Sequence, residues 1–363
     1  MVIKTLSVKN FRNHKETKVE LSPCINVFIG DNAQGKTNLL EAIFLTCVGR
    51  GWRTRKDSDM IAFEEDIARV CTLVSRKYGD ITIDIKLARQ GKKEIKINDI
   101  PIQKMGELMG QINCVFFSPD ELRLIKEAPS DRRRFMDIDI SQIDKNYFHA
   151  LLRYNKILAQ RNALLKSTTE NILAGLKIWN DEFATHAAYI IARRIRFIAQ
   201  LKSDARRLHL LISQGREVLD VSYETFLGTA PSGLDALKSA IVSALEDSLE
   251  KDLRLRTTTL GPHRDDIKIM LNKKDVRLFA SQGQQRTAAL SIKLAELELF
   301  GNETGEKPCL LLDDVFSELD SERQKLLLNV IQGHQTIITT TGQEGLEQLP
   351  NIDYFYIKDG SLL

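Results

Sequence analysis

The sequence lacks the residue patterns that build disulfide frameworks, metal centres and membrane spans. Its five cysteines are widely spaced, odd in number and free of any C-x-x-C pair, which is typical of reduced thiols in a cytosol. The six histidines show no metal-ligand spacing, so we expect no structural metal. No run approaches ~18 uninterrupted apolar residues, so no membrane span is predicted. The N-terminal residues mix apolar and polar side chains instead of forming an apolar h-region, so we expect no secretory signal and a cytoplasmic protein.

The composition is that of an ordinary globular chain. Hydrophobic residues make up 43% and charged residues 28% of the 363 positions, which excludes a disordered, collagen-like or low-complexity protein. At roughly 100–200 residues per domain, the length allows two or three domains. The sequence contains no internal repeat and no Gly/Ser-rich linker.

Charge is distributed unevenly along the chain. The net charge is only +3, yet residues 123–216 hold 18 Lys and Arg against 9 Asp and Glu, and the remainder holds 34 against 40. A solvated helical face and a surface that binds a polyanion both fit such a basic block, so other features must decide between them.

The periodicity of apolar residues divides the chain into three zones. Residues 3–117 are β-rich with an early strand-to-helix step at 25–48, residues 130–214 are almost wholly helical with a break at 166–170, and the rest alternates. Strands are predicted at 3–8, 17–21, 25–29, 68–76, 81–88, 94–97, 112–117, 217–223, 266–271, 276–279, 309–313, 335–340 and 354–357. Further helices are predicted from Ser118 and at 233–251, 284–300 and 321–332. A helical block is therefore inserted into an α/β domain whose halves come from the two ends of the chain.

The segment Gly30–Thr37 fits the phosphate-loop pattern G-x-x-x-x-G-K-[ST]. Its glycines allow backbone N–H groups to surround a phosphate, and the following helix directs its positive N-terminus to the same place. Lys36 is then expected to reach the β- and γ-phosphates, and the Thr37 hydroxyl to ligate Mg²⁺. A strand before the loop and a helix after it strengthen this interpretation.

Two further segments supply chemistry that a nucleotide site needs. An apolar strand at 310–312 ends in Asp313 and Asp314, where one carboxylate can hold Mg²⁺ and the other can act as general base toward water. Ser281, Gly283 and Gln284 precede a helix, which suits either a γ-phosphate site or a simple N-cap.

The pattern N-K-x-D at 272–275 is also typical of guanine-specific GTPases. Here it lies between two predicted strands, where Asn, Lys and Asp suit a hairpin turn. It also precedes the strand that ends in Asp313, which is the wrong chain order for a GTPase. We therefore expect a turn at 272–275 and no preference for GTP.

The order of these motifs resembles the ABC-type ATPase heads of the SMC kind, and more narrowly the bacterial RecF family. The resemblance runs colinearly from about Met1 to Gly342. Its segments are Asn10–Asn13, Gly30–Thr37, Phe117–Leu122, Pro129–Asp137, Gly261–Asp266, Ser281–Arg286 and Leu311–Asp320. It implies a P-loop ABC-type ATPase head (α/β, mixed β-sheet) formed by residues 1–129 plus 252–363, with an inserted, mostly helical, basic lobe at 130–251.

The resemblance also implies a function. The family binds ATP with Mg²⁺, acts as a weak, DNA-stimulated ATPase, and binds single-stranded, duplex and gapped DNA. It supports RecA loading at gaps with RecO and RecR, and thereby replication restart and the SOS response. ATP is expected to close two copies head to head, with Ser281 of each copy completing the other's site.

Carried onto this sequence, the resemblance implies a set of site residues. Lys36, Asp314 and Ser281 would be catalytic, and Thr37 and Asp313 would hold Mg²⁺. The nucleotide would contact Arg12, Asn13, Gly30, Asp31, Asn32, Ala33, Gln34, Gly35, Lys36, Thr37, Asn38, Ser281, Gly283 and Gln284. Two positions depart from the wider ABC pattern: Asp314 replaces the usual catalytic Glu, which suits slow turnover, and Thr340-Thr341 stands where many relatives have a switch histidine.

DNA contacts are predicted from the basic block, at Arg193, Arg194, Arg196, Arg206 and Arg207. Two other functions remain open at this point. A transporter-type ATPase subunit would place its phosphate loop and S-x-G-Q far closer together than the 245 residues between Lys36 and Ser281. A non-hydrolysing dimer that uses ATP only to hold its halves together fits the same motifs.

Overall fold

A computed structural model describes the chain except residues 55, 119–122, 168–171, 317–318, 344–345 and 347–350. The chain forms two compact units: a discontinuous unit, Met1–Glu121 with Leu290–Leu363, and an inserted unit, Leu122–Ala289. The sequence placed the second junction at 251/252 instead. Residues 252–289 join the inserted unit because strand β10 (Asp266–Leu271) pairs along its whole length with β9 (Leu219–Glu224).

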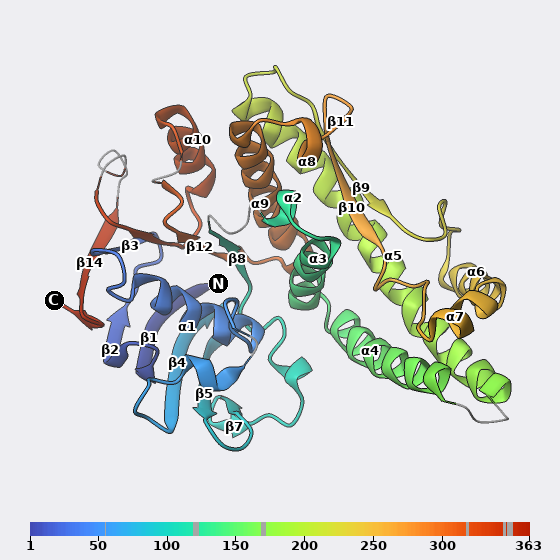
Figure 1. Cartoon of the computed structure of the whole chain (residues 1–363). Helices are drawn as coiled ribbons and strands as arrows, with labels where there is room; N and C mark the ends of the chain where they lie inside the picture. The colour runs from blue at the N-terminus through green and yellow to red at the C-terminus, as the bar shows by residue number, and fades with distance from the viewer. Residues whose placement is uncertain (55, 119–122, 168–171, 317–318, 344–345, 347–350) are drawn as a thin grey trace. The chain divides into compact units, whose positions relative to one another are not determined.

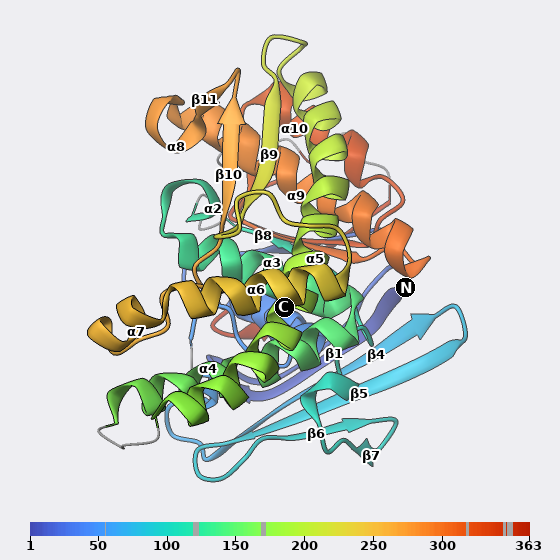
Figure 2. The same cartoon turned by 90° about the vertical axis from the view of Figure 1, so that its right-hand side faces the viewer.

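The first sheet of the discontinuous unit is an antiparallel sheet with the strand order β2-β1-β4-β5-β6-β7. Its strands are β1 (Val2–Phe11), β2 (His14–Glu20), β4 (Ile67–Arg76), β5 (Gly79–Ala88), β6 (Glu94–Ile97) and β7 (Ile100–Pro101). Buried and exposed residues alternate along β4, so one face packs on the core and the other faces solvent. Figure 2 shows the long strands β1, β4 and β5 side by side.

The second sheet has the order β15-β14-β3-β13-β12-β8 and is parallel except for the β14–β15 hairpin. Its strands are β3 (Ile25–Ile29), β8 (Cys114–Phe117), β12 (Cys309–Asp313), β13 (Thr336–Thr340), β14 (Ile352–Lys358) and β15 (Ser361–Leu362). Every residue of β3, β8 and β13 is buried, as expected for parallel strands covered on both faces.

Helix α1 (Lys36–Val48) lies between the two sheets (Figure 1) and contacts strands of both. Eleven of its thirteen residues are buried, so the helix is covered around most of its circumference and not along one stripe. The same unit contains η1 (Asp57–Met60), η2 (Met105–Glu107), α10 (Ser321–Ile331) and the C-terminal part of α9 (Gln282–Thr304).

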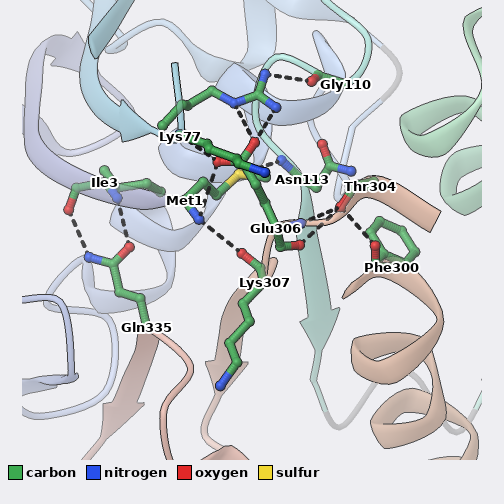
Figure 3. Close-up of polar contacts among 11 residues, drawn as sticks. Met1, Ile3, Lys77, Gly110, Asn113, Phe300, Thr304, Glu306, Lys307 and Gln335 are labelled. Atoms are coloured by element: carbon green, nitrogen blue, oxygen red, sulfur yellow. Dashed lines mark hydrogen bonds and ion pairs between the residues drawn. The ribbon is translucent and has the colours of Figure 1, made fainter. Parts of the chain in front are cut away.

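Polar contacts connect the two sheets near the start of the chain (Figure 3). Arg76 of β4 donates to Glu306 through Nε (3.0 Å) and Nη2 (2.5 Å). Burial opposes ionisation of Glu306, but the bonds from Arg76 and from the backbone N of Lys77 lower its pKa. Gln335 bonds both backbone groups of Ile3 at 2.7 Å, which ties β1 to the start of β13.

The inserted unit packs helices against a small antiparallel sheet of order β11-β10-β9, with β11 at Lys274–Asp275. Its helices are α2 (Arg123–Lys126), α3 (Pro129–Ile143), α4 (Lys145–Lys166), α5 (Ile172–Ile212), α6 (Leu234–Asp247), α7 (Leu249–Leu255) and α8 (Val276–Phe279). The predicted helical block has a break that the sequence did not indicate. Asp144 ends α3 and caps α4, because its Oδ1 accepts from the backbone N of Asn146 (2.9 Å) and Tyr147 (3.2 Å).

The strand predicted at 276–279 is wrong, since these residues form α8. Asp275 caps that helix by accepting from the backbone N of Arg277 at 2.8 Å. The turn predicted just before it is confirmed: β10 and β11 pair across Asn272 and Lys273, which have φ values of 49° and 67°, as a two-residue hairpin requires. The N-K-x-D pattern is therefore a structural turn. The helix predicted from Ser118 begins in residues outside the described part of the chain.

Buried ion pairs hold the inserted unit together. The Arg161 and Asp252 side chains are both 0% exposed, with Nη1 and Oδ2 2.7 Å apart. Arg161 also donates to Thr258 Oγ1 (2.8 Å), and Asp252 Oδ1 accepts from the backbone N of Thr259 (2.9 Å). Both residues thus have polar contacts beyond the pair itself, which help to offset the cost of burying the two charges. Among the described helices, none is long and apolar enough to cross a membrane.

We predict that Asp252→Leu destabilises the protein by about 3–5 kcal/mol, because Arg161 would stay buried without its counter-ion. Denaturant unfolding followed by circular dichroism measures the change. Asp181→Leu is the matched control: Asp181 pairs with Lys238 while its side chain is 65% exposed, so its loss should cost below about 1 kcal/mol. Equal losses in both variants would contradict a structural role for the buried pair.

Candidate nucleotide site

The phosphate loop connects β3 to α1 and depends on two glycines. Gly35 has φ +110°, and a Cβ there would lie 2.6–2.8 Å from side-chain atoms of Asn13 and His14. A Cβ at Gly30 would lie 2.4 Å from the carbonyl oxygen of Ile357 on β14. The close packing of Asn13, His14 and β14 therefore leaves room only for glycine.

Lys36 lies at the first position of α1, 7% exposed, with its ammonium inside the loop. Its Nζ donates to the carbonyl oxygens of Gly30 (2.5 Å) and Asp31 (2.8 Å). Burial lowers the pKa of Lys36, while the nearby carboxylates of Asp314, Asp313 and Asp31 oppose that shift. The lysine thus spans the loop from the inside, where an anion would replace the carbonyls as its partner.

Asp313 at the end of β12 joins three elements of the sheet. Its Oδ1 accepts from Thr37 Oγ1 on α1 (2.6 Å) and from Thr339 Oγ1 on β13 (2.7 Å). A hydroxyl and a carboxylate are hard oxygen donors of the kind Mg²⁺ prefers. No group of three His, Cys, Asp or Glu among the described residues forms a metal cage. The pair Thr37–Asp313 therefore suits a Mg²⁺ ion that takes its remaining ligands from phosphate and water.

Asp314 follows directly and adopts φ +50°, a left-handed conformation that Asp tolerates. Its backbone N donates to both the carbonyl oxygen and Oγ1 of Thr339, each at 3.1 Å. Because β13 lies between β3 and β12, this anchoring holds Asp314 at the same sheet edge as the phosphate loop.

The segment Arg12–His14 forms a second wall of the loop. Asn13 Nδ2 donates to the carbonyl oxygen of Gln34 (3.0 Å), and its Oδ1 accepts from Asn38 Nδ2 (2.7 Å). Arg12 donates through Nε to the buried Glu41 carboxylate at 2.9 Å. Its Nη2 is buried with no hydrogen-bond partner among the described residues, which suits a donor to a bound anion.

Three residues of this region were missed by sequence reasoning. Arg53 donates to Asn38 Oδ1 (3.1 Å) and lies 3.9 Å from Asp313 Oδ2. Glu41 orients Arg12. His14 Nε2 lies 3.0 Å from the carbonyl oxygen of Gly35, and burial lowers the His14 pKa. None belongs to a short motif, so only the tertiary structure brings them to the loop.

Ser281, Gly283 and Gln284 belong to the inserted unit, at the start of α9. Ser281 Oγ accepts from the backbone N of Gln284 (3.3 Å), and Gln284 Oε1 accepts from the backbone N of Ser281 (2.8 Å). This is a reciprocal capping box. Ser281 is exposed, and because its Oγ acts as acceptor in the cap, the hydroxyl proton remains available for another acceptor.

The DNA-binding prediction is wrong for Arg194, which is 2% exposed. Its guanidinium donates to Tyr147 Oη (2.9 Å), to the carbonyl oxygen of Pro262 (2.7 Å) and to Asp137 Oδ1 (2.8 Å). Arg193 pairs with Asp144 at 2.8 Å. The other three predicted residues, Arg196, Arg206 and Arg207, are exposed on α5.

Known proteins resemble this chain over nearly its whole length. A family model of the RecF/RecN/SMC N-terminal domain covers residues 2–360. A protein of Alkaliphilus oremlandii named DNA replication and repair protein RecF is 43% identical over 365 residues, covering 100% of both chains. The chain belongs to the RecF family. A family member from Clostridium botulinum (strain ATCC 19397 / Type A) is 43% identical over 348 residues, covering 96% of this chain and 94% of that one.

Solved structures agree with the family and its fold. The recombination mediator protein RecF with ATP, described as part of the RecFOR pathway, superposes with a TM-score of 0.93 at 40% identity, covering 100% of this chain and 97% of that one. An SMC head bound to the C-terminal winged-helix domain of ScpA has a TM-score of 0.59 at 15% identity, covering 100% of this chain and 96% of that one. The second likeness shows that the chain has the fold of SMC/ABC-type ATPase heads, as the sequence predicted.

We predict that Gly35→Ala weakens binding of a fluorescent ATP analogue at least about tenfold, since a left-handed φ and the clash with Asn13 and His14 would distort the loop. Gly301→Ala is the control: Gly301 lies in α9, where an added Cβ would have no neighbour within 4 Å, so alanine should leave binding unchanged. Normal binding by Gly35→Ala would contradict the assigned site.

Proposed function

We propose that the chain is an ATP-switched DNA-binding protein of recombinational DNA repair. The observation that carries this proposal is the convergence of Lys36, Thr37 and Asp313 at one sheet edge in a chain that matches RecF proteins over its whole length. Acting on chromosomal DNA, it would work in the cytoplasm, with RecO, RecR and RecA as partners by family resemblance.

Nucleotide phosphates would replace groups of the loop itself as hydrogen-bond partners. Lys36 would exchange the carbonyls of Gly30 and Asp31 for β- and γ-phosphate oxygens, while backbone N–H groups of residues 30–38 surround them. Arg12 would donate a hydrogen bond from its buried Nη2 to a phosphate oxygen. Thr37 and Asp313 would hold Mg²⁺, which neutralises charge on the phosphates when bound.

Asp314 would orient and deprotonate the attacking water. Its carboxylate is one methylene shorter than that of the Glu common in ABC ATPases, and Thr340 stands at the position of a switch histidine. Both features support slow hydrolysis that ends an ATP-bound state instead of driving a motor. The limiting case, a dimer that binds ATP without hydrolysing it, is separated from this proposal by a turnover assay.

Closure of two copies would complete the site. The exposed Ser281 hydroxyl and the positive N-terminus of α9 form a γ-phosphate binder, and a two-fold axis would bring each copy's Ser281 to the other copy's phosphate loop. Hydrolysis would then remove the shared γ-phosphate and let the copies separate.

DNA contacts would be made largely to phosphates. We expect Arg196, Arg206 and Arg207 on α5 to contact DNA, because they are exposed. Arg193, which pairs with Asp144, would add a further contact. Phosphate contacts are insensitive to sequence, which suits binding to single-stranded, duplex and gapped DNA.

We predict ATP-dependent dimerisation. Sedimentation velocity should show a monomer without nucleotide and a dimer with ATP and Mg²⁺. Ser281→Arg should prevent dimerisation, because a bulky cation would occupy the γ-phosphate position, and should leave ATP binding by the monomer intact. Normal dimerisation of this variant would refute the trans role of Ser281.

We also predict that DNA affinity falls steeply with salt and rises with ATP. Release of counterions from phosphates causes the first effect, and thermodynamic linkage requires that DNA raises ATP affinity by the same factor. Salt titrations on two unrelated sequences, with and without ATP, measure both. Arg206→Ala with Arg207→Ala should reduce the salt slope, while Lys15→Ala with Lys18→Ala on β2 serves as control. A flat salt dependence would remove the phosphate contacts, and equal affinity with and without ATP would remove the switch.

A further inference from the structure

Each unit exposes apolar side chains close in sequence to residues of the proposed nucleotide and dimer contacts. In the discontinuous unit Phe63 is 95% exposed; in the inserted unit Leu278 and Phe279 are 65% and 69% exposed. Single exposed apolar residues are common and need no explanation. The Phe63 and α8 sites differ from other exposed apolar residues in three ways. Hydrogen bonds fix their backbone, they lie close in sequence to proposed site residues, and they carry neighbouring charges of opposite sign.

Phe63 is presented by a loop with a fixed backbone, the Phe63 loop (62–66). Arg89 donates through Nη2 to the carbonyl oxygens of Ala62 and Phe63 (2.7 Å each) and through Nε to that of Glu65 (2.5 Å). The backbone N of Ala62 donates to the carbonyl oxygen of Asn10 at 2.9 Å. The exposure of Phe63 is therefore built into the fold.

The Phe63 loop also adjoins the nucleotide site. The segment just before it bonds Arg12, whose backbone N donates to the carbonyl oxygen of Met60 at 2.8 Å and whose Nη1 donates to that of Asp59 at 2.6 Å. Three exposed carboxylates follow Phe63 along the chain: Glu64, Glu65 and Asp66.

Leu278 and Phe279 are presented by α8, directly before Ser281. The inner side of α8 is anchored, since Val276 is 1% exposed and its carbonyl oxygen accepts from the backbone N of Ala280 and from Gln285 Nε2, each at 3.2 Å. Figure 1 shows α8 beside the β10–β11 hairpin.

Exposed cations flank the apolar side chains of α8 along the chain, and exposed carboxylates follow Phe63. Lys273, Lys274 and Arg277 are exposed. Asp275 is the one acid among them, and its carboxylate accepts from the backbone N of Arg277 as the helix cap. We call residues 273–279 the α8 segment. This segment presents apolar side chains beside three exposed cations. The Phe63 loop presents one beside three exposed carboxylates, which outnumber the single cation of Arg89 that bonds the loop.

We infer that the α8 segment of one copy docks on the Phe63 loop of a second copy when ATP closes the dimer. The inference rests on the proposed dimerisation, in which Ser281 approaches the partner copy's phosphate loop. The residues three and two positions before Ser281 must then come close to the surface around that loop. A two-fold axis makes the contact twice in each dimer.

The apolar residues, the charged residues and Ser281 would play different roles in this contact. Burial of Phe63, Leu278 and Phe279 removes apolar surface from water and favours the closed state. The opposite charges set orientation and suppress wrong pairings. The γ-phosphate contact of Ser281 makes closure depend on ATP, and the docking of α8 supplies part of its strength.

Charge reversal tests this pairing. The acidic-side variant combines Glu64→Lys with Glu65→Lys, and the basic-side variant combines Lys274→Glu with Arg277→Glu. Each variant alone brings like charges together at both contacts of its own dimer, so the Kd of ATP-dependent dimerisation should rise at least about tenfold. An equimolar mixture places opposite charges at both contacts, so the mixed dimer should return to within about threefold of the unaltered protein.

Sedimentation velocity with ATP and Mg²⁺ measures these constants, and binding of a fluorescent ATP analogue by each variant reports an intact monomer. The control is Glu16→Lys with Glu20→Lys, which reverses two exposed carboxylates on β2 and should leave dimerisation unchanged. If a charge variant loses ATP binding, Phe63→Ser and Phe279→Ser replace it, and each should weaken the dimer at least about tenfold.

The outcomes separate this inference from the proposed function. If the unaltered protein stays monomeric with ATP, the proposed dimer is wrong. If it dimerises and Ser281→Arg does not, the proposed function stands. The charge-reversal variants then show whether the α8 segment docks on the Phe63 loop. Variants that dimerise like the unaltered protein, or a mixture no better than either variant alone, would overturn the inference.

Discussion

The burial of α1 between two sheets is the constraint on which the nucleotide site depends. Because eleven of its thirteen residues are buried, the helix cannot rotate or slide without exposing apolar surface or opening the core. Its N-terminus is thereby held at the sheet edge where β3, β12 and β13 end. The oxygen atoms of Thr37, Asp313 and Thr339 then meet within hydrogen-bond distance, and Lys36 lies inside a loop that only glycines can form.

The inserted unit packs helices that carry many cations, and burying a cation without a counter-ion is costly. It pairs some of these cations internally. The buried Arg161 and Arg194 pair with Asp252 and Asp137, respectively, and Arg132 bonds Asp266 at 2.6 Å. These arginines act as core residues. The positive charge counted along the chain therefore overstates what reaches the surface, and only the exposed part can steer a polyanion.

The proposed switch would combine the nucleotide site with a surface that a second copy covers. The Lys36 ammonium bonds two carbonyls of its own loop, and Ser281 forms a capping box with Gln284, so both motifs have internal hydrogen bonds. The energetic advantage of closing would come from the shared phosphate and from the docking of α8 on the Phe63 loop, which are absent in a single copy.

Local patterns in the sequence determined the phosphate loop, the two carboxylates at the end of the apolar strand, the turn within 272–275 and most strands. Each depends on neighbouring residues and on the period of apolar side chains. The sequence alone could not determine contacts between distant segments. It missed α8, where a cap from Asp275 overrides an alternating pattern. It also assigned Arg194 to DNA, because a buried arginine and an exposed one look alike until the carboxylate that pairs with it is known. The positions of Glu41, Arg53 and the Phe63 loop around the nucleotide site were likewise decided only by the tertiary structure, since burial and ion pairing are properties of the packed chain and not of any short stretch of it.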